Sequence, residues 1–407
     1  MNTIFIDSDE EKNHIAIVEE ETLVEYFIES KSETKTLGNI YRARVENVLK
    51  GMEAAFVNIG EAKNAYLYLT DAMTRGDRFS DKEYSINDLV KTGDEVIVQV
   101  IKEALGSKGA KITTNLSISG RNIVITPFQK GINISKKIKS KEAVNLLKSI
   151  GDEFKGDNVG VIFRTAAGNA DRDIIIEEYK HLLASYKYIE SQRNFLPTPK
   201  LIYKEAGLVE KIVRDNFNKE NYQIVVNTEA IYYELLELEE KAGMELKGKL
   251  ILDKDLDFKY NSLIQKGLTI ALSRSVKLKS GGSIVIDQTE ALTAIDVNTY
   301  KYVGSTSFDS TIINTNIEAA EEIARQIKLR NIGGIIIIDF IDMISDGDNK
   351  DLMNALEKYF RRDKNKPYIV DITKLGLVEV TRKKERPTLE REMMIKCSAC
   401  EGRGRIR

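Results

Sequence analysis

Acidic side chains follow two strongly apolar stretches, and they are the residues best suited to chemistry. Asp296 and Asn298 end the stretch TAIDVN, and Asp339 and Asp342 follow the isoleucines of GGIIIIDFIDM. Each apolar run predicts a buried strand, so the acids lie where a strand leaves the core. Two neighbouring carboxylates repel unless a cation neutralises them, and such hard oxygen ligands suit Mg²⁺ or Mn²⁺. A metal there can polarise a phosphoryl oxygen, but acids that merely cap turns fit the pattern equally well.

A histidine-based acid–base pair is disfavoured, because the 407-residue chain contains only two histidines. Any hydrolysis would therefore rely on carboxylates and a metal ion. The chain also contains only two cysteines, Cys397 and Cys400, in the stretch CSAC. Their spacing is that of half a tetrahedral zinc site, and a partner chain would have to supply the other two ligands. Two reduced thiols near the end of the chain are the alternative.

Aromatic and basic residues in the first half of the chain could contact nucleic acid. Phe56 and Tyr66 lie on predicted strands where they could stack on bases, and Lys108 could neutralise a backbone phosphate. Aromatic residues on strands more often belong to a core. Arg164 and Thr165 follow the strand in GVIFRTAAG and could anchor a phosphate through a guanidinium fork and a hydroxyl group.

The elements that must position these residues change along the chain from β to α/β. A length of 407 residues predicts roughly two to four folding units. Short apolar runs predict a strand meander that ends near Lys35. About five strands with glycine-bearing turns follow, which is the pattern of a small Greek-key barrel of the OB type. Later strands alternate with helices, and the runs that end in Asp296 and Asp339 predict one α/β layer in which both strands are buried.

Composition excludes several classes of protein. Hydrophobic residues make up 42% of the chain and charged residues 30%, with a net charge of −2, as in a soluble globular protein. No apolar run approaches the roughly 18 residues that a membrane span requires. The N-terminus carries acids where a signal peptide needs a basic region. We therefore expect a cytoplasmic protein.

Six stretches carry a resemblance to a known family. They are, in order, GNIYRARVENVLKGMEAAFVNIG, GVIFRTAAG, LKSGGSIVIDQTEALTAIDVNT, GGIIIIDFIDM, KLGLVEVTRKKERPTL and CSACEGRGRI. Together they closely resemble the catalytic region of the ribonuclease E/G family, in a short form like that of the G branch. The resemblance implies a Mg²⁺-dependent endoribonuclease that cuts single-stranded RNA to 5′-phosphate and 3′-hydroxyl products. Its expected roles are rRNA and tRNA processing or mRNA decay.

The same resemblance implies a multidomain α/β and α+β fold. An RNase H-like domain would be interrupted by a barrel and a sensor, and a DNase I-like catalytic domain and a zinc link would follow. The implied boundaries are 1–36 and 209–272 for the RNase H-like domain, 37–118 for the OB-fold RNA-binding barrel, 119–208 for the 5′-monophosphate sensor, 273–395 for the DNase I-like domain and 396–407 for the zinc link.

The resemblance assigns roles to individual residues by their positions in the matching motifs. Asp296 and Asp339 match the family's magnesium ligands, and Asn298 matches the residue that orients the scissile phosphate or the water. Three residues match the RNA-clamping positions of the barrel: Phe56, Tyr66 and Lys108. Four match the sensor for a 5′-monophosphate: Arg164, Thr165, Gly120 and Val124.

The resemblance also predicts the partners. Cys397 and Cys400 match a link in which two protomers share one structural Zn²⁺, so we expect a zinc-linked homodimer. The sequence ends at Arg407 without the family's additional small domain, which argues against a tetramer, and without the scaffold tail that recruits degradosome partners. The alternative function is a non-catalytic RNA-binding or ribosome-assembly factor that uses the same barrel.

Overall fold

The computed structural model of the chain describes residues 2–31, 36–73, 83–104, 108–194, 197–216, 222–242, 246, 248–299, 308–343, 345–384 and 386–400. It contains two compact units, each built from segments that are distant in sequence. The first comprises Met1–Ser30, Asn221–Glu229 and Lys249–Arg407, and the second comprises Lys31–Glu220 and Ala230–Gly248. Among the described residues, no helix combines the length and the apolar character that crossing a membrane requires.

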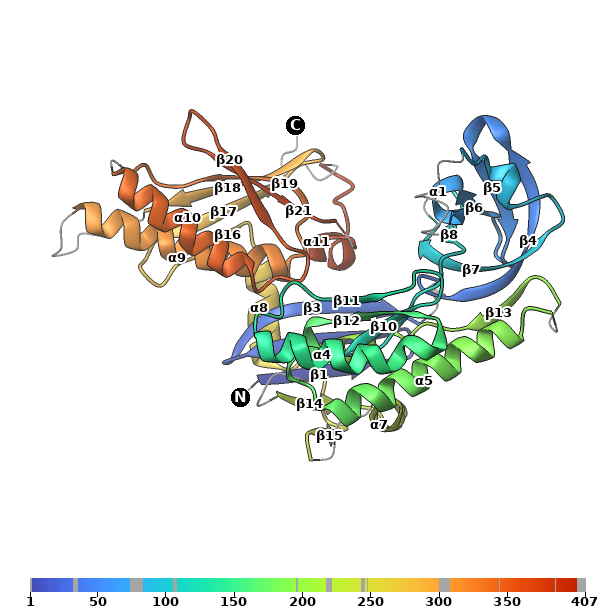
Figure 1. The fold of residues 1–407 in the computed structure, drawn as a ribbon. Helices are drawn as coiled ribbons and strands as arrows, with labels where there is room; N and C mark the ends of the chain where they lie inside the picture. Colours follow the sequence, from blue (N-terminus) through green and yellow to red (C-terminus); the bar gives the residue numbers. More distant parts are fainter. Residues whose placement is uncertain are drawn as a thin grey trace. The chain divides into compact units, whose positions relative to one another are not determined.

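The N-terminal strands of the first unit pair with strands from much later in the chain. The meander predicted from the sequence is confirmed as three antiparallel strands, β1 (Asn2–Ser8), β2 (Lys12–Glu19) and β3 (Thr22–Ser30). β1 also pairs in parallel with β14 (Tyr222–Val226), which pairs in parallel with β15 (Leu250–Leu252) (Figure 1). Helices α8 (Ser262–Leu272) and α11 (Leu389–Met393) contribute Ile264, Leu268 and Leu389 to the core of this sheet.

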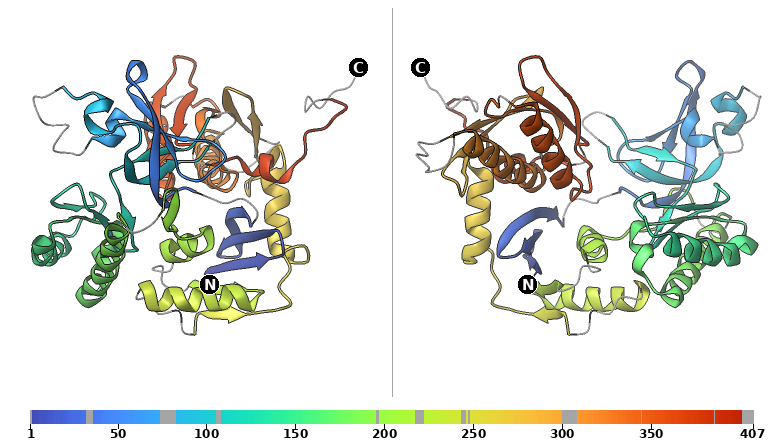
Figure 2. Two further views of the ribbon diagram at one scale, coloured as in Figure 1. Left: turned by 90° about the vertical axis from the view of Figure 1, so that its right-hand side faces the viewer. Right: turned by 60° about the vertical axis from the view of Figure 1, so that its left-hand side comes forward.

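The second sheet of this unit carries the acids. Its strands lie in the order β16 (Ser275–Lys277), β17 (Ser283–Gln288), β18 (Leu292–Asn298), β19 (Gly334–Asp339), β21 (Val378–Arg382) and β20 (Tyr368–Ile372). β18 and β19 are parallel, whereas the other neighbours are antiparallel. Helices α9 (Phe308–Leu329) and α10 (Asp346–Phe360) cover one face (Figure 2).

The expectation of two buried strands is therefore only half right. Ile336 and Ile338 are fully buried against the helices, whereas Ile335, on the opposite face of β19, is 55% exposed. A run of four isoleucines resembles a strand covered on both sides, but helices cover only one side here.

The second unit contains the predicted barrel. Strands β4 (Ile40–Leu49), β5 (Ala54–Asn58), β6 (Ala65–Tyr68), β8 (Lys111–Thr113) and β7 (Glu95–Lys102) pair in this order. β7 pairs again with β4, which closes a five-stranded barrel consistent with the OB type. β13 (Lys200–Tyr203) pairs with the first residues of β4, Ile40–Arg42, ahead of the part of β4 that pairs with β5. Short helical turns lie between the strands: η1 (Lys50–Met52), α1 (Leu69–Ala72) and α3 (Ile86–Leu89).

A smaller sheet completes the second unit. Its order is β11 (Ile132–Ile134), β12 (Gly160–Phe163), β10 (Ile123–Thr126) and β9 (Ile118–Ser119). Helices α4 (Lys141–Glu153) and α5 (Arg172–Ser191) pack on it through Leu147, Ile150 and Ile175. The remaining elements of this part of the chain are η2 (Phe154–Asp157), η3 (Thr165–Asn169), α6 (Leu208–Asn216) and α7 (Glu229–Ala242).

Candidate catalytic and anion-binding sites

Asp296 and Asp339 lie side by side on the two parallel strands of the second sheet. They are register partners in the pairing of β18 with β19. Neighbouring strands are about 4.8 Å apart, so partners at one register position project their side chains to the same face as near neighbours. Both acids are exposed, while the preceding residues Ile295 and Ile338 are buried against α9 and α10. The two carboxylates, hereafter the acid pair, therefore share the open face of the sheet.

Asn298 completes this group from the same strand. It follows Asp296 by two residues, which returns its side chain to the open face. Its Nδ2 donates a hydrogen bond of 2.6 Å to Oδ2 of Asp296 and so orients that carboxylate. Asp342 is exposed but lies beyond the end of β19.

The donor set fits a magnesium ion. Mg²⁺ prefers oxygen ligands, keeps several waters and takes one or two carboxylates from the protein. The acid pair provides two carboxylates at one position, and the Asn298 amide adds an oxygen nearby. The described part of the chain contains no group of three or more His, Cys, Asp or Glu residues placed to hold a metal ion.

A buried asparagine that the sequence did not single out fixes the chain just after Asp339. Asn316 on α9 is fully buried. Its Oδ1 accepts a hydrogen bond of 3.1 Å from the amide of Ile341, and its Nδ2 donates one of 2.8 Å to the carbonyl of the same residue. The only signal in the sequence was an amide within the apolar face of the helix NTNIEAAEEIARQ.

Phe56 and Tyr66 lie on the outside of the barrel rather than in its core. They are register partners on β5 and β6, and both are partly exposed. Their strand neighbours face inward; these are Ala55, Val57, Ala65 and Leu67, all fully buried. Lys108 is exposed just before β8.

Two further residues extend this surface. Tyr68 is 38% exposed, and its ring meets that of Tyr66 edge to face with centroids 5.2 Å apart. The ammonium group of Lys111 lies 5.5 Å from the Tyr68 ring centroid and 2.7 Å from a carboxylate oxygen of Asp71. We call Phe56, Tyr66 and Tyr68 the aromatic face. The alternation in AYLYL could have indicated Tyr68, because residues two apart on a strand share a face.

Three of the four predicted sensor residues gather around the turn between β9 and β10. Nη1 of Arg164 donates a hydrogen bond of 2.7 Å to the carbonyl of Gly120. Oγ1 of Thr165 lies 2.9 Å from Oγ of Ser135. Gly120, Ser135, Arg164 and Thr165 are hereafter the Arg164 cluster. The fourth predicted residue, Val124, lies on β10 as the register partner of Ser119, next to that turn.

A buried carboxylate holds this turn in place. Glu178 on α5 is 5% exposed and accepts hydrogen bonds from the backbone amide and from Nδ2 of Asn122, at 3.0 and 2.8 Å. Burial raises the pKa of Glu178, and the bonds from Asn122 oppose that shift. A Cβ at Gly120 would lie 2.0 Å from Oε1 of Glu178, so only glycine fits there without a shift. An acid inside the helix pattern IIIEEYKHLL was the signal that the sequence offered.

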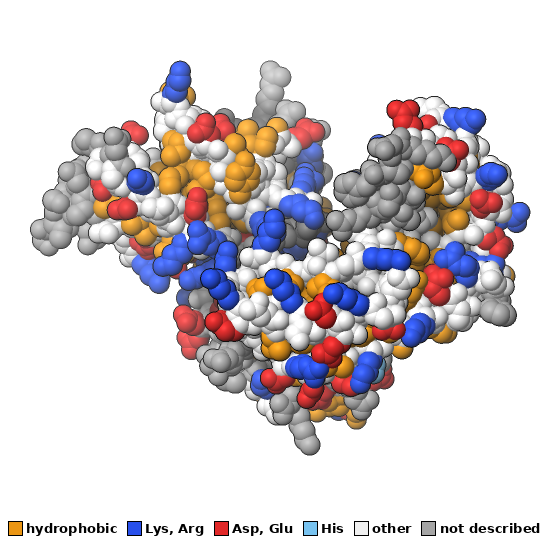
Figure 3. Space-filling model, in the orientation of Figure 1, with side chains coloured by type: hydrophobic (Ala, Val, Ile, Leu, Met, Phe, Trp, Pro, Cys, Tyr) orange, Lys and Arg blue, Asp and Glu red, His pale blue; other side chains and the backbone are white. Residues whose placement is uncertain are grey.

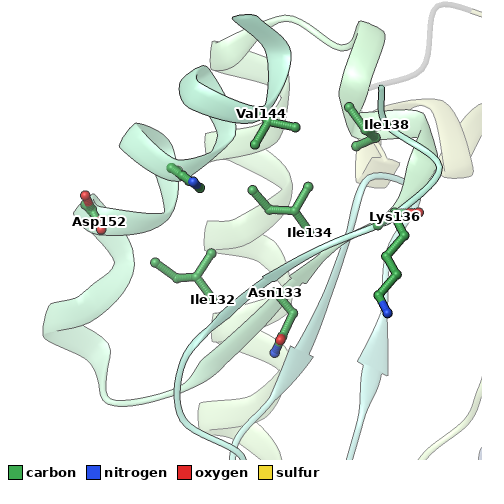
Figure 4. A pocket seen from close by; sticks show the side chains of 9 residues that line it. Ile132, Asn133, Ile134, Lys136, Ile138, Val144 and Asp152 are labelled. Carbon is green, nitrogen blue, oxygen red and sulfur yellow. The ribbon is translucent and has the colours of Figure 1, made fainter. Parts of the chain in front are cut away.

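A cavity of about 440 Å³ lies between β11 and α4 (Figure 4). Ile132, Ile134 and Val144 form much of its apolar lining, and Lys136 and Lys148 add positive charge. None of the predicted site residues lines it. It adjoins the Arg164 cluster through Ser135, which lines the cavity and contacts Thr165.

The two cysteines lie close to the end of the described chain. Cys397 is exposed and Cys400 is partly exposed. A structural zinc ion takes four ligands, so the pair supplies at most half of such a site.

Comparison with known proteins places these sites in context. Residues 117–385 match the sequence profile of the Ribonuclease E/G family. The chain is 36% identical to Ribonuclease G of Haemophilus influenzae over 405 residues, which span 97% of this chain and 82% of that protein. Ribonuclease G of Escherichia coli strain K12 is also 36% identical, over 410 residues and the same shares. Ribonuclease E of a Nostoc species is 34% identical over 403 residues, or 97% of this chain and 58% of that protein.

Proposed function

The chain belongs to the ribonuclease E/G family and is an endoribonuclease of that type, and we propose that it hydrolyses single-stranded RNA at the acid pair with Mg²⁺. The products would be a 5′-phosphate and a 3′-hydroxyl, in rRNA and tRNA processing or in mRNA decay. The observation that carries this proposal is the register match of Asp296 and Asp339 on the open face of the sheet.

Four residues would form and hold the catalytic site. Asp296 and Asp339 concentrate two negative charges at one point of an exposed surface, which a scissile phosphate can reach. Asn298 holds the Asp296 carboxylate in one orientation through its 2.6 Å bond. Asn316 fixes the chain after Asp339 and so limits the motion of that strand end. A Mg²⁺ ion bound there would neutralise charge on the phosphate and lower the pKa of a bound water.

Removing either carboxylate tests the catalytic site. Asp296→Asn and Asp339→Asn should each lower kcat by about 100-fold or more on a 5′-phosphorylated single-stranded oligonucleotide, because the metal loses a charged ligand. Fluorescence anisotropy should show RNA binding retained. The matched control is Asp287, an acid on β17 that pairs with Arg274. The Asp287→Asn variant should cleave normally. Unchanged cleavage in both variants would overturn the site. A wild type that fails to cut with every divalent ion tested would favour the RNA-binding factor.

The aromatic face would select unpaired RNA. Bases can stack on Phe56, Tyr66 and Tyr68 only when they are free of a duplex, and each stack contributes about 1–3 kcal/mol. Lys108 and Lys111 would contact the backbone phosphates. Tyr66→Leu should raise KM whatever group the 5′ end of the RNA carries. Tyr188 is an exposed tyrosine on α5, and the control variant Tyr188→Leu should leave KM unchanged.

The Arg164 cluster would bind a 5′-monophosphate. Arg164 offers guanidinium N–H groups beyond the one bonded to Gly120, and Thr165 offers a hydroxyl at the adjoining position. Anchoring the 5′ end would raise the rate by fixing the substrate's position. Arg164→Ala should abolish the advantage of 5′-phosphorylated over 5′-hydroxyl RNA and leave cleavage of the 5′-hydroxyl RNA intact. An advantage that persists in Arg164→Ala would place the sensor elsewhere.

We also propose the family's domain layout for this chain. The RNase H-like domain would combine 1–36 with 209–272, and the pairing of β1 with β14 supports a discontinuous domain. The barrel would occupy 37–118, the sensor 119–208, the DNase I-like domain 273–395 and the zinc link 396–407.

A zinc-linked homodimer is the proposed assembly. Each chain would supply Cys397 and Cys400 to one shared Zn²⁺. Hydrophobic side chains also gather on the surface over β20 and its neighbours (Figure 3), where Tyr368 and Val370 are 59% and 50% exposed, and a second copy could bury them. Cys397→Ser should release zinc and shift the mass in light scattering from dimer to monomer. A dimer that persists after zinc removal would contradict the link.

A further inference from the structure

A lysine shares the open face of the second sheet with the acid pair. Lys277 lies on β16, the strand at the edge of that sheet. It is the register partner of Ser283 on β17, and Ser283 is in turn the register partner of Asn298 on β18. Their strand neighbours are buried on the helix-covered face; these are Val276, Ile284 and Val297. Because register partners project to the same face, the Lys277 side chain lies on the side that carries the acid pair.

Lys277 also differs from the other cation on this part of the sheet. Arg274, just before β16, binds Asp287 on β17, with Nε 2.5 Å from Oδ1 and Nη2 2.6 Å from Oδ2. The charge of Arg274 is thus offset by its partner. No residue in the part of the chain that the structure describes makes a salt bridge or a hydrogen bond with the exposed Lys277 ammonium group. That group is therefore available to an anion from solution.

The turn that follows Lys277 is anchored to helix α9. The carboxylate of Glu318 accepts hydrogen bonds from the backbone amides of Lys279 and Ser280. A Cβ at Gly282 would lie 2.9 Å from a backbone carbonyl oxygen of β18, so the hairpin packs closely against that strand. The same helix holds the chain after β19 through the buried asparagine described above. One helix therefore supports both the hairpin of Lys277 and the strand end of the acid pair.

The spacing of the strands sets how far Lys277 lies from the acid pair. Neighbouring strands are about 4.8 Å apart, so β16 and β18 are about 10 Å apart. A flexible four-carbon stem carries the lysine ammonium group, which can extend over Ser283 toward β18. It does not reach a metal ion held between β18 and β19. It can meet a phosphate group beside the one that such a metal ion binds.

An RNA strand that crosses this face needs positive charge beside the metal ion. Asp296, Asp339 and Asp342 are all exposed, and each RNA phosphate adds a further negative charge. A magnesium ion would offset the charges at the scissile phosphate, but it would leave the neighbouring phosphates uncompensated. A lysine binds phosphate as a point charge, and Lys277 places one on the open face two strands from Asp296.

We propose that Lys277 binds the RNA phosphate next to the scissile phosphate, on the β16 side of the acid pair. This inference rests on the proposed cleavage at Asp296 and Asp339. Lys277 would hold the strand in place without touching the reacting atoms, so its loss should weaken binding rather than slow the chemical step. A lysine on an edge strand can also prevent pairing with another chain, and that role would not depend on RNA.

The first part of the test removes the charge of the lysine. Lys277→Gln and Lys277→Ala should each raise KM for a single-stranded oligonucleotide by about 3- to 5-fold and leave kcat unchanged, the effect of losing one exposed ion pair. Two neutral variants are measured so that the result does not depend on the folding of one. Lys277→Arg keeps the charge and should keep KM near that of the wild type. Lys266 is an exposed lysine on α8, and Lys266→Ala is the control.

The second part removes the charge of one phosphate. A single methylphosphonate linkage, which is neutral, replaces each phosphate near the cleavage site in turn, while the scissile phosphate stays unmodified. With the wild type, KM should rise by a similar factor when the linkage next to the scissile phosphate is neutral. With Lys277→Gln the same linkage should have no further effect, because both changes remove one interaction.

Salt dependence gives a third, independent measurement. RNA binding is measured by anisotropy at several salt concentrations in an Asp339→Asn background, which prevents cleavage. Losing one phosphate contact should make the slope of log affinity against log salt concentration shallower by about 0.7 in Lys277→Gln. Lys266→Ala should leave that slope unchanged.

Several results would overturn the contact. One is that the effects of Lys277→Gln and of every neutral linkage simply add, and another is that KM is unchanged in both neutral variants. If these variants also self-associate in light scattering, the lysine protects the sheet edge instead. If the wild type does not cleave, or if Asp296→Asn and Asp339→Asn cleave normally, the proposed catalytic site is wrong and the role of Lys277 is wrong with it. Additive effects in a wild type that cleaves at the acid pair remove only the role of Lys277.

Discussion

The acid pair and the Arg164 cluster are assembled in different ways. Asp296 and Asp339 come together through the backbone register of two parallel strands, and each carboxylate projects from a regular element. The Arg164 cluster comes together through side-chain contacts, such as that of Arg164 with the Gly120 carbonyl, across 44 residues of sequence. Strand register positions a group through many ladder hydrogen bonds, whereas a turn held by side chains depends on a few contacts.

This difference suits the two tasks that we propose for these sites. A metal site needs carboxylates at defined distances, and rigid elements provide them. The proposed sensor must distinguish among similar RNA ends, and a turn held by single side-chain contacts, such as that of Arg164 with Gly120, can be adjusted by single substitutions. We therefore expect cleavage to be sensitive to small displacements of the acid pair. We expect 5′-end sensing to be sensitive to changes in the residues that hold the turn, such as Glu178 and Gly120.

The largest expected effect comes from lengthening one acid while keeping its charge. Asp339→Glu moves the carboxylate by one methylene group, and the register of β18 and β19 gives the backbone no means to compensate. Because a displacement of about 1 Å can cost 100-fold in rate, kcat should fall by about that factor with little change in KM. Asp287→Glu on β17 is the control. Near-normal cleavage by Asp339→Glu would show that register does not define the site.

A smaller effect is expected from crowding the turn of the Arg164 cluster. In Gly120→Ala the new Cβ would lie 2.0 Å from Oε1 of Glu178 and 3.0 Å from Cδ1 of Leu182. The turn must shift, at a cost of about 1–3 kcal/mol in the free energy of unfolding. The advantage of 5′-phosphorylated RNA should be lost while 5′-hydroxyl RNA is still cut. Gly156→Ala, whose Cβ would meet nothing within 4 Å, is the control. If Gly120→Ala still prefers 5′-phosphorylated to 5′-hydroxyl RNA, the turn is not required for sensing.

The contrast also explains what could be predicted from the sequence. Apolar runs ending in Asp296 and Asp339 indicated two strands whose ends bring the acids together, with a metal site and turn caps equally open, and the family resemblance favoured the magnesium site. The open face of β19 could not be predicted, because four consecutive isoleucines do not reveal which side the helices cover. Glu178 was missed because its partner Asn122 lies 56 residues away, and no local pattern records such a contact.

The smallest expected effect is a change in stability with pH, which the buried acid Glu178 should cause and an exposed acid should not. Burial raises the pKa of Glu178, so the folded chain holds a proton there at a pH where the unfolded chain has lost it. Its contribution to stability is complete below the unfolded pKa and is lost as pH rises through the folded pKa.

Glu178→Gln does not titrate, so the comparison isolates this contribution. In urea titrations the free energy of unfolding of the wild type should fall relative to that of Glu178→Gln as the pH rises from the unfolded pKa of the glutamate through its raised folded pKa. Glu177, the next residue, is exposed, and its hydrogen bond from Lys180 lowers its pKa. Glu177→Gln should therefore show no such loss. If the difference in free energy of unfolding between the wild type and Glu178→Gln stays constant with pH, the hydrogen bonds from Asn122 keep Glu178 ionised. The turn would then be held by a buried charge rather than by a buried acid that takes up a proton.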